Sequence, residues 1–255
     1  MVTIFRYPGG KSRLINYLLP HLNKEHLTDA FVGGGSLPLA YAQKYPAATL
    51  HLNDLDANIF SFWHTVATGE KLSALLELVG RRPTVELFKH LRETVPETMI
   101  DKAYYAVFFN RTTFSGIATA SPIGGYRQES KWAIDCRYNI DRLQKNIVAA
   151  HELLRGRTIV TNVCATEVLT NKGMYLDPPY FVKGDALYPV KFREHVTMSE
   201  RLVDYKNWAL SYDDAPEIRD LYKWAQIDEV SVNYTIRGKK TSGKKTNELL
   251  ILPRP

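Results

Sequence analysis

The sequence has few cysteines and no long apolar run, and each absence excludes a class of protein. Only two of its 255 residues are cysteine, Cys136 and Cys164, and their contexts are unrelated. A disulfide framework or a cysteine-based metal site is therefore not expected. No apolar stretch approaches the ~20 residues of a membrane-spanning helix, and the first residues lack the apolar core of a secretory signal. These features predict a cytoplasmic protein that binds neither a metal nor a membrane.

The positive charge is unevenly distributed, although the overall composition is that of an ordinary globular protein. With 45% hydrophobic and 24% charged residues, the chain suits one large α/β domain or one domain with an insertion. The net charge is +6. Residues 102–157 hold nine basic and four acidic side chains, and residues 230–255 hold six and one. If these segments converge, they form a positive face for a polyanion such as nucleic acid; a mildly basic solvated surface is the alternative.

Short apolar segments next to glycine, proline or acidic residues predict a sheet. The expected strands are residues 27–31, 49–53, 158–162, 173–176, 207–211, 229–233 and 248–252. The expected helices are residues 36–44, capped by Ser36, and residues 59–78 and 139–154. Periodicity does not decide between helix and strand for residues 102–110, and the glycine, serine and proline of residues 115–127 predict a loop.

Strand–loop–helix units at both ends of the chain flank a basic, mainly helical middle. This order predicts one α/β domain, made of residues 1–60 and 158–255. Residues 61–157 would interrupt it as an insertion.

A glycine-rich turn follows the first predicted strand. Residues 29–36 (DAFVGGGS) end that strand in three glycines, which let the backbone approach a ligand closely because no Cβ intervenes. Asp54 follows the next strand, 21 residues after Gly33, where an acid is placed to hold a ribose hydroxyl. No Gly-Lys-Ser/Thr follows these glycines, which excludes a phosphate-binding P-loop. The alternative is a tight strand–helix turn that binds nothing.

Residues 175–180 (YLDPPY) are the most specific feature of the sequence. Two consecutive prolines fix φ and remove two backbone donors, so at a strand end they form a rigid corner. Asp177 and the carbonyl of Pro178 then present two acceptors, which match the two N–H donors of a planar amino group. Drawing both hydrogens toward acceptors frees the nitrogen lone pair for attack, and Tyr180 offers a flat face to a flipped-out base. A structural turn after a buried strand is the alternative.

A third motif precedes the first helix. Residues 5–11 (FRYPGGK) combine aromatic residues, a Pro-Gly-Gly turn and a lysine. This combination suits a loop that closes over a small charged ligand, and an ordinary surface turn is the alternative.

Together, these motifs in this order resemble those of the Dam-type DNA adenine methylases, α-class enzymes that use S-adenosylmethionine. The resemblance covers nearly the whole chain. It rests on residues 7–11, 31–36, 53–54, 110–116 (NRTTFSG), 177–180, 208–214 and 248–251. It implies an α/β fold with a Rossmann-like methyltransferase core and a mainly helical target-recognition insertion at residues 61–157.

The resemblance also implies roles for the matching residues. S-adenosylmethionine, or its product S-adenosylhomocysteine, would be bound by Tyr7, Lys11, Phe31, Gly33, Gly35, Asp54 and Asp177. Asp177 and Pro178 would face the target amino group, and Tyr180 would stack on the flipped adenine.

Further residues would contact double-stranded DNA. Arg111 and Arg127 would meet phosphates or bases, and Phe114 would be a wedge between base pairs, unless it is a core aromatic residue. Lys239 and Lys240 belong to a basic segment that we predict as a hairpin tip, which either follows the DNA backbone or is a solvated loop. Residues 118–125 depart from the Arg-Tyr-Asn stretch of members that read GATC, so the recognition sequence stays open.

The implied reaction is direct methyl transfer to the exocyclic nitrogen of adenine, by a monomer or weak dimer in a bacterial or phage-infected cell. Neither cysteine has the Pro-Cys context of enzymes that methylate the cytosine ring. Three alternatives stay open. One is an RNA guanine-amino methyltransferase, which can share the Asp-Pro-Pro-aromatic corner. Another is a cytosine-amino methyltransferase, which usually has serine at the position of Asp177, and the third is a catalytically silent DNA-binding module.

Overall fold

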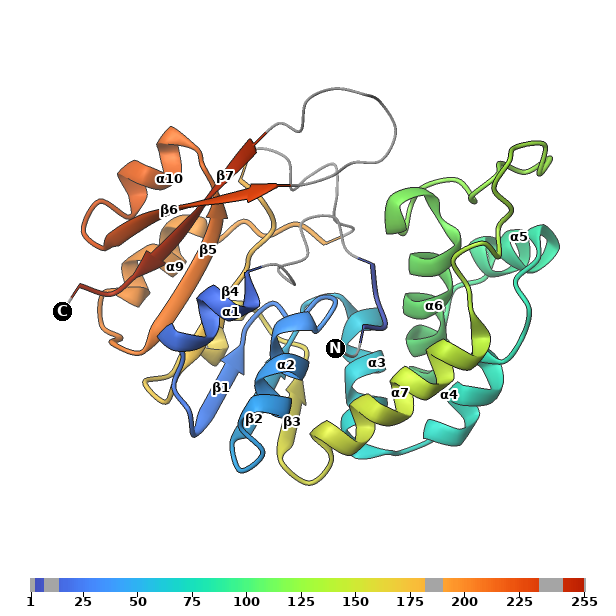
Figure 1. The fold of residues 1–255 in the computed structure, drawn as a ribbon, viewed down its shortest axis with the longest axis horizontal. Coiled ribbons are helices and arrows are strands. Elements are labelled where there is room, and N and C mark those ends of the chain that lie inside the picture. Colours follow the sequence, from blue (N-terminus) through green and yellow to red (C-terminus); the bar gives the residue numbers. More distant parts are fainter. Residues whose placement is uncertain (1–2, 7–13, 182–189, 234–244, 255) are drawn as a thin grey trace.

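The computed structural model describes residues 3–6, 14–181, 190–233 and 245–254, which fold around a seven-stranded sheet (Figure 1). Its strand order is β3-β2-β1-β4-β5-β7-β6. The strands are β1 (His26–Asp29), β2 (Thr49–Asn53), β3 (Thr158–Thr161), β4 (Met174–Leu176), β5 (Trp208–Asp213), β6 (Gln226–Asn233) and β7 (Lys245–Leu252). β1 to β5 are parallel, whereas β7 pairs antiparallel with both β5 and β6. Each strand expected from the sequence is present, and the predicted α/β class is confirmed.

Helices and short 3-10 turns connect the strands. They are α1 (Ile15–Leu18), η2 (Leu19–His21), α2 (Ser36–Lys44), α3 (Ala57–Thr68), α4 (Leu72–Val79), α5 (Val85–Glu93), α6 (Met99–Thr112), η3 (Phe114–Gly116), α7 (Ile140–Leu154), η4 (Ala165–Val168), α9 (His195–Leu202) and α10 (Pro216–Leu221). In Figure 1, α4 to α7 gather beside the β3 edge of the sheet and form the helical part of the molecule. This part falls within the insertion expected at residues 61–157.

The prediction of a single helix over residues 59–78 is wrong. Gly69 ends α3 with a left-handed φ of 78°, and Lys71 begins α4 with a φ of 55°. A side chain at Gly69 would meet the ring of His151 at 2.8 Å. The chain turns at Gly69 because glycine adopts the left-handed backbone conformation freely, and this conformation ends α3.

Two helix starts bear on the predictions. The start of α2 differs from the prediction at Ser36, and the start of α6 decides that residues 102–110 are helical. Gly35, with φ 66°, is the N-cap of α2, and Ser36 is the first helical residue, so Ser36 does not cap this helix. Residues 102–110 lie inside α6, which begins with a capping box between Thr98 and Asp101. That box satisfies backbone donors at the helix start and favours helix over strand for the apolar run.

Gly35 also meets a packing constraint that no other residue would satisfy. A Cβ at Gly35 would lie 2.1 Å from the Trp63 ring. We expect Gly35→Ala to lower the free energy of unfolding by about 3 kcal/mol, from left-handed strain and overpacking together. Urea unfolding measures this loss.

The matched control is Gly156→Ala. Gly156 has a similar φ of 73°, but a Cβ there meets nothing within 4 Å. That variant should lose only about 1 kcal/mol. Equal losses for the two variants would show that the Trp63 contact does not restrict Gly35.

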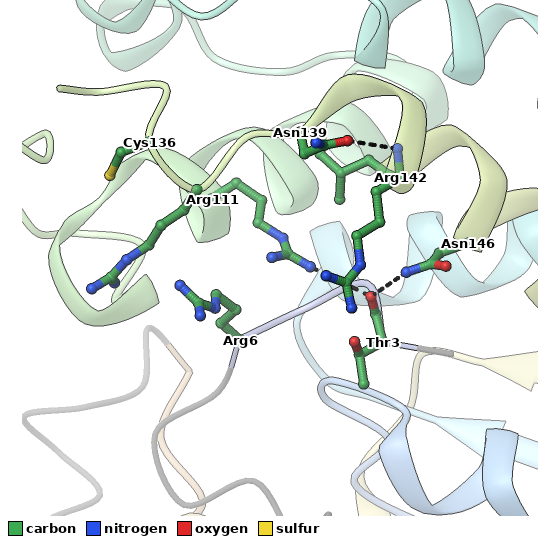
Figure 2. A pocket seen from close by; sticks show the side chains of 9 residues that line it. Thr3, Arg6, Arg111, Cys136, Asn139, Arg142 and Asn146 are labelled. Atoms are coloured by element: carbon green, nitrogen blue, oxygen red, sulfur yellow. Dashed lines mark hydrogen bonds between the residues drawn. The ribbon is translucent and has the colours of Figure 1, made fainter. Parts of the chain in front are cut away.

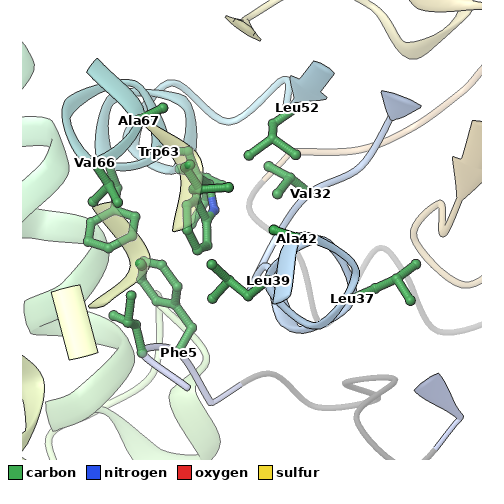
Figure 3. Packing of buried hydrophobic residues seen from close by; sticks show 14 of the residues in the cluster. Phe5, Val32, Leu37, Leu39, Ala42, Leu52, Trp63, Val66 and Ala67 are labelled. Atoms are coloured by element: carbon green, nitrogen blue, oxygen red, sulfur yellow. The ribbon is translucent and has the colours of Figure 1, made fainter. Parts of the chain in front are cut away.

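One apolar cluster joins the sheet to the helical part. It includes Leu27 and Leu50 of the sheet together with Phe88, Phe108 and Ile147 of the helices. Figure 3 shows its centre, where Phe5 lies near Trp63 and Val66 of α3; the Phe5 and Trp63 rings are 6.1 Å apart. α3 packs against both α6 and α7. The shared core fixes the helical part against the sheet.

The described residues contain neither a helix that could cross a bilayer nor a cluster of metal-ligating side chains. No helix there combines the length and apolar character needed to cross a bilayer. No group of three or more His, Cys, Asp or Glu side chains there is arranged to hold a metal ion.

Candidate active site

The sheet topology brings the sequence motifs together at the carboxyl ends of the parallel strands. β1 lies between β2 and β4, so the chain leaves β1 in one direction and returns on its other side. Asp29, the last residue of β1, is paired with Leu52 of β2 and Tyr175 of β4. The glycine turn, Asp54 and Asp177 follow these positions at the carboxyl ends of the strands. In open α/β sheets, ligands bind in the crevice outside the carboxyl ends of the strands, at the point where the strand order reverses.

Asp54 is hydrogen-bonded directly to the glycine turn. The Gly33 N–H donates to Asp54 Oδ2 at 2.8 Å, and the Asp56 N–H donates to Oδ1 at 3.0 Å. Gly33 has a φ of 43°, in the left-handed region. Burial raises the pKa of the Asp54 carboxyl to about 7, while these two N–H donors act in the opposite direction. The 21-residue spacing thus corresponds to a contact in the fold.

Asn53 fixes the strand end that carries Asp54, although the sequence analysis gave this residue no role of its own. Its buried side chain donates to the carbonyls of Ala30 and Val163, both at 3.1 Å. Its Oδ1 accepts from Thr161 Oγ1 at 2.8 Å and from the Val163 N–H at 3.2 Å. All polar positions of the amide are used, so the ends of β1, β2 and β3 are held together.

A small pocket joins the ends of β1, β2 and β4. Phe31, Asp54 and Pro179 all line it, together with Phe192. The rings of Phe31 and Phe192 meet edge to face with centroids 5.1 Å apart. An acid and two aromatic rings around one cavity suit a ligand with a flat ring and hydroxyl groups.

The carboxyl groups of Asp29, Asp54 and Asp177 interact electrostatically at the carboxyl ends of these strands. Asp29 is almost fully buried, and burial raises its pKa well above the usual range. The Phe31 N–H opposes this shift, and the charges of Asp177 and Asp54 add to it. Asp177, Asp54 and the glycine turn therefore belong to one neighbourhood, as the sequence analysis expected.

The proline corner is held by β5 and β7. The Ser211 hydroxyl donates to Asp177 Oδ1 at 3.0 Å and lies 2.8 Å from the Tyr175 hydroxyl. Tyr180 donates to Glu248 Oε1 at 3.0 Å. Asp177 and Tyr180 are half-buried, whereas Ser211 and Glu248 are almost fully buried. Ser211 and Glu248 are site residues that the sequence analysis missed; the only signal was a polar residue within an apolar strand.

Gly35 contacts Trp63 rather than the pocket. The Trp63 indole N–H donates to the Gly33 carbonyl at 2.9 Å, and the indole ring fills the space above Gly35. The need for glycine at position 35 is thus explained by packing.

The predicted DNA-contacting residues lie in different surroundings. Phe114 is 67% exposed, so the alternative that it is a core aromatic residue is wrong. Arg127 is exposed, whereas Arg111 is half-buried and donates from Nη2 to the Ile4 carbonyl. Pro178 is buried. Four predicted site residues lie outside the described residues: Tyr7, Lys11, Lys239 and Lys240.

Comparison with known proteins gives one family. A model of the D12 class N6 adenine-specific DNA methyltransferase family matches residues 7–236. This span includes the glycine turn, the helical part and the proline corner. No curated protein matches the chain.

Proposed function

Because the chain belongs to the D12 class N6 adenine-specific DNA methyltransferase family, we propose that its pocket binds S-adenosylmethionine and that residues 177–180 receive the target adenine. The protein is an enzyme that methylates adenine in DNA at the exocyclic N6 nitrogen. The family match favours neither an RNA guanine-amino methyltransferase nor a silent DNA-binding module. The observation that carries the proposal is that Phe31, Asp54 and Pro179 line one pocket.

The pocket residues fit S-adenosylmethionine chemically. Each Asp54 oxygen accepts one backbone N–H and keeps a further lone pair, so the carboxylate can also accept the ribose hydroxyls. Phe31 and Phe192 offer apolar walls to an adenine ring. The carboxylate of Asp177 would offset a nearby cation. When bound, the cofactor supplies a methyl group activated by a positively charged sulfonium.

The proline corner orients the amino group that accepts the methyl. We assign Asp177 and the Pro178 carbonyl as acceptors for its two N–H groups, and Tyr180 as the face on which the flipped base stacks. Ser211 holds Asp177 Oδ1 and Glu248 holds the Tyr180 hydroxyl. The groups that meet the base are thus fixed before it arrives, and the rate gain comes mainly from this positioning.

We assign target recognition to residues 61–157 and the methyltransferase core to residues 1–60 and 158–255. Two observations support this division. The helical part extends beyond the edge of the sheet (Figure 1), and Phe114 projects from it as an exposed aromatic side chain. An exposed aromatic side chain suits insertion between base steps, and Arg127 suits contact with phosphates or bases.

We further propose that the substrate is double-stranded DNA, that the enzyme acts as a monomer or weak dimer, and that it works in the cytoplasm, where bacterial and phage DNA is found. A monomer suits an enzyme that modifies one strand at a time. The reaction assigned to Asp177 and Pro178 needs no metal.

Transfer of tritium from labelled S-adenosylmethionine tests the function. Purified protein is incubated with duplex DNA and, separately, with RNA, and the labelled nucleoside is identified after digestion. We expect label in N6-methyladenine from DNA alone. Label in guanine of RNA, or in cytosine, would refute the assignment.

Ser211 is predicted to act as a positioning residue for Asp177. Ser211→Ala removes the hydrogen bond to Asp177 Oδ1, so we expect kcat to fall about tenfold or more, the usual effect of a hydrogen bond to a charged group. The KM for S-adenosylmethionine should change little. Steady-state kinetics separates the two effects.

Ser199→Ala is the matched control. Ser199 is equally buried and donates to the Leu221 carbonyl at 2.9 Å. It should lower the melting temperature by a similar amount without the fall in kcat. A fall in kcat that matches in both variants would mean that Ser211 acts only through stability.

A further inference from the structure

Four arginines line a pocket between the N-terminal segment and helices α6 and α7 (Figure 2). They are Arg6, Arg111, Arg137 and Arg142, and the pocket has a volume of about 280 Å³. In Figure 2, the guanidinium groups of Arg6, Arg111 and Arg142 lie around the same space. No acidic side chain of the described residues lines it.

Hydrogen bonds from the helical part hold the N-terminal segment at this pocket. Asn110 pairs with the backbone of Arg6, accepting its N–H at 2.7 Å and donating to its carbonyl at 3.0 Å. Arg111 donates to the Ile4 carbonyl, and Asn146 donates to the Thr3 carbonyl at 2.8 Å. The pocket is therefore built by segments that are far apart in the sequence and fixed together.

Within the part of the chain that the structure describes, the four positive charges have no carboxylate partner. None of them forms an ion pair with a carboxylate of the described residues. Burial, followed by the charges of Arg6 and Arg142, lowers the pKa of Arg111 to about 10. Burial, followed by the charge of Arg137, also lowers the pKa of Arg6. Like charges this close repel one another, and a bound anion would offset the repulsion.

Two further features favour an anion. The Nε of Arg111 is buried without a hydrogen-bond partner among the described residues, and a buried donor left unpaired is costly. The 15-residue helix α7 begins here, with Asn139 as its N-cap, and its dipole adds positive potential.

We propose that this arginine pocket binds a phosphate group of the DNA backbone. Guanidinium groups pair with phosphate oxygens through two parallel hydrogen bonds. Arg6, Arg137 and Arg142 are exposed at the pocket, so a duplex can reach them, while Arg111 lies deeper. The proposal rests on DNA being the substrate, as proposed above. It adds a second anchor point for the duplex, apart from residues 177–180, which receive the target adenine.

The test is the salt dependence of DNA binding. Fluorescence anisotropy measures the Kd of a labelled duplex between 0.05 and 0.3 M NaCl, on the order of the range where phosphate contacts dominate. The variants are Arg137→Gln, Arg142→Gln and the double variant; both arginines are exposed, so the fold should persist, and circular dichroism checks this. We expect about a tenfold weaker Kd per arginine at low salt. The plot of log association constant against log [NaCl] has a negative slope, which should become shallower by about one for each arginine replaced.

Arg155→Gln is the matched control. Arg155 caps the other end of α7 and pairs with Glu152 at 2.9 Å on the surface. It removes the same charge from the same helix, and its Kd and salt slope should match those of the wild type. The losses in the pocket variants should be equal for methylatable and random duplexes, because phosphates carry no sequence information.

The outcomes separate this inference from the proposed function. If the wild type methylates DNA but the pocket variants keep its Kd and slope, the pocket inference fails alone. If the wild type neither binds nor methylates DNA, both fail. If millimolar inorganic phosphate raises the melting temperature of the wild type but not of the double variant, while their DNA slopes agree, the pocket is a small-anion site, and the DNA assignment is overturned.

Discussion

Replacing Asp177 with alanine is expected to lower the kcat of adenine methylation by about 10³-fold, which corresponds to about 4 kcal/mol of transition-state stabilisation. The carboxylate accepts from the target amino group in our proposal, and Ser211 already fixes its Oδ1. A preorganised group that meets the reacting atom typically contributes this much. Single-turnover transfer of labelled methyl to a duplex measures the chemical step apart from product release.

Two further variants make the Asp177 result interpretable. Asp177→Asn keeps an acceptor oxygen for Ser211 and the shape of the side chain, so it should fold like the wild type and still lose more than tenfold in rate. Asp214→Ala removes an exposed carboxylate just beyond the end of β5 that pairs with Arg219, and it should leave the rate unchanged. DNA binding should survive in all three variants. A wild-type rate in Asp177→Ala would refute the assigned role.

The sequence allowed the fold and the main motifs of the site to be predicted because their signals are local. Strand β4 and residues 177–180 are contiguous, and their apolar and proline patterns determine a strand that ends in a corner. The contact between Gly33 and Asp54 follows from two strands that are adjacent in the chain and parallel in the sheet. Such contacts need only the usual βαβ arrangement.

The partners of the proline corner could not be predicted, because they depend on strand pairing. Ser211 lies next to Asp177 since Leu176 of β4 is paired with Leu210 of β5. Glu248 reaches Tyr180 only because β7 inserts antiparallel beside β5. Nothing in the sequence near either residue specifies that register.

The arginine pocket and the exact helix ends escaped prediction for related reasons. Arg111 was selected from its neighbours in the sequence as a DNA contact, yet its side chain also holds the Ile4 carbonyl of a segment more than 100 residues away. Gly35 replaces Ser36 as the N-cap of α2 because the Trp63 ring and the left-handed backbone decide that position. Tertiary packing overrides local preference at such sites.

Asp54→Ala is expected to weaken S-adenosylmethionine binding by about 10³-fold, because it removes the carboxylate that would accept two ribose hydroxyls. Isothermal titration calorimetry with the purified protein measures this Kd. The variant also loses the partner of the Gly33 N–H, so Asp54→Asn serves as the companion that preserves shape. The asparagine variant should bind about tenfold or more weakly. Because its amide has one acceptor oxygen for the Gly33 and Asp56 N–H groups, it should melt below the wild type but above Asp54→Ala. Unchanged cofactor affinity in both variants would exclude Asp54 from the cofactor site.

The pH dependence of cofactor binding distinguishes the charge of Asp54 from its shape. Burial raises its pKa to about 7, so the carboxyl is largely protonated at pH 6 and ionised at pH 8. Since the ionised form accepts the hydroxyls, the Kd should tighten by about tenfold across that interval. The stability of the protein without cofactor responds in the opposite direction. A carboxyl whose folded pKa exceeds its unfolded value contributes stability at low pH and loses it as the pH rises through 7. Asp54→Asn should abolish the change in Kd, while the neighbouring acids Asp29 and Asp56 remain in place. A pH dependence that persists in Asp54→Asn would place its origin in those neighbours instead.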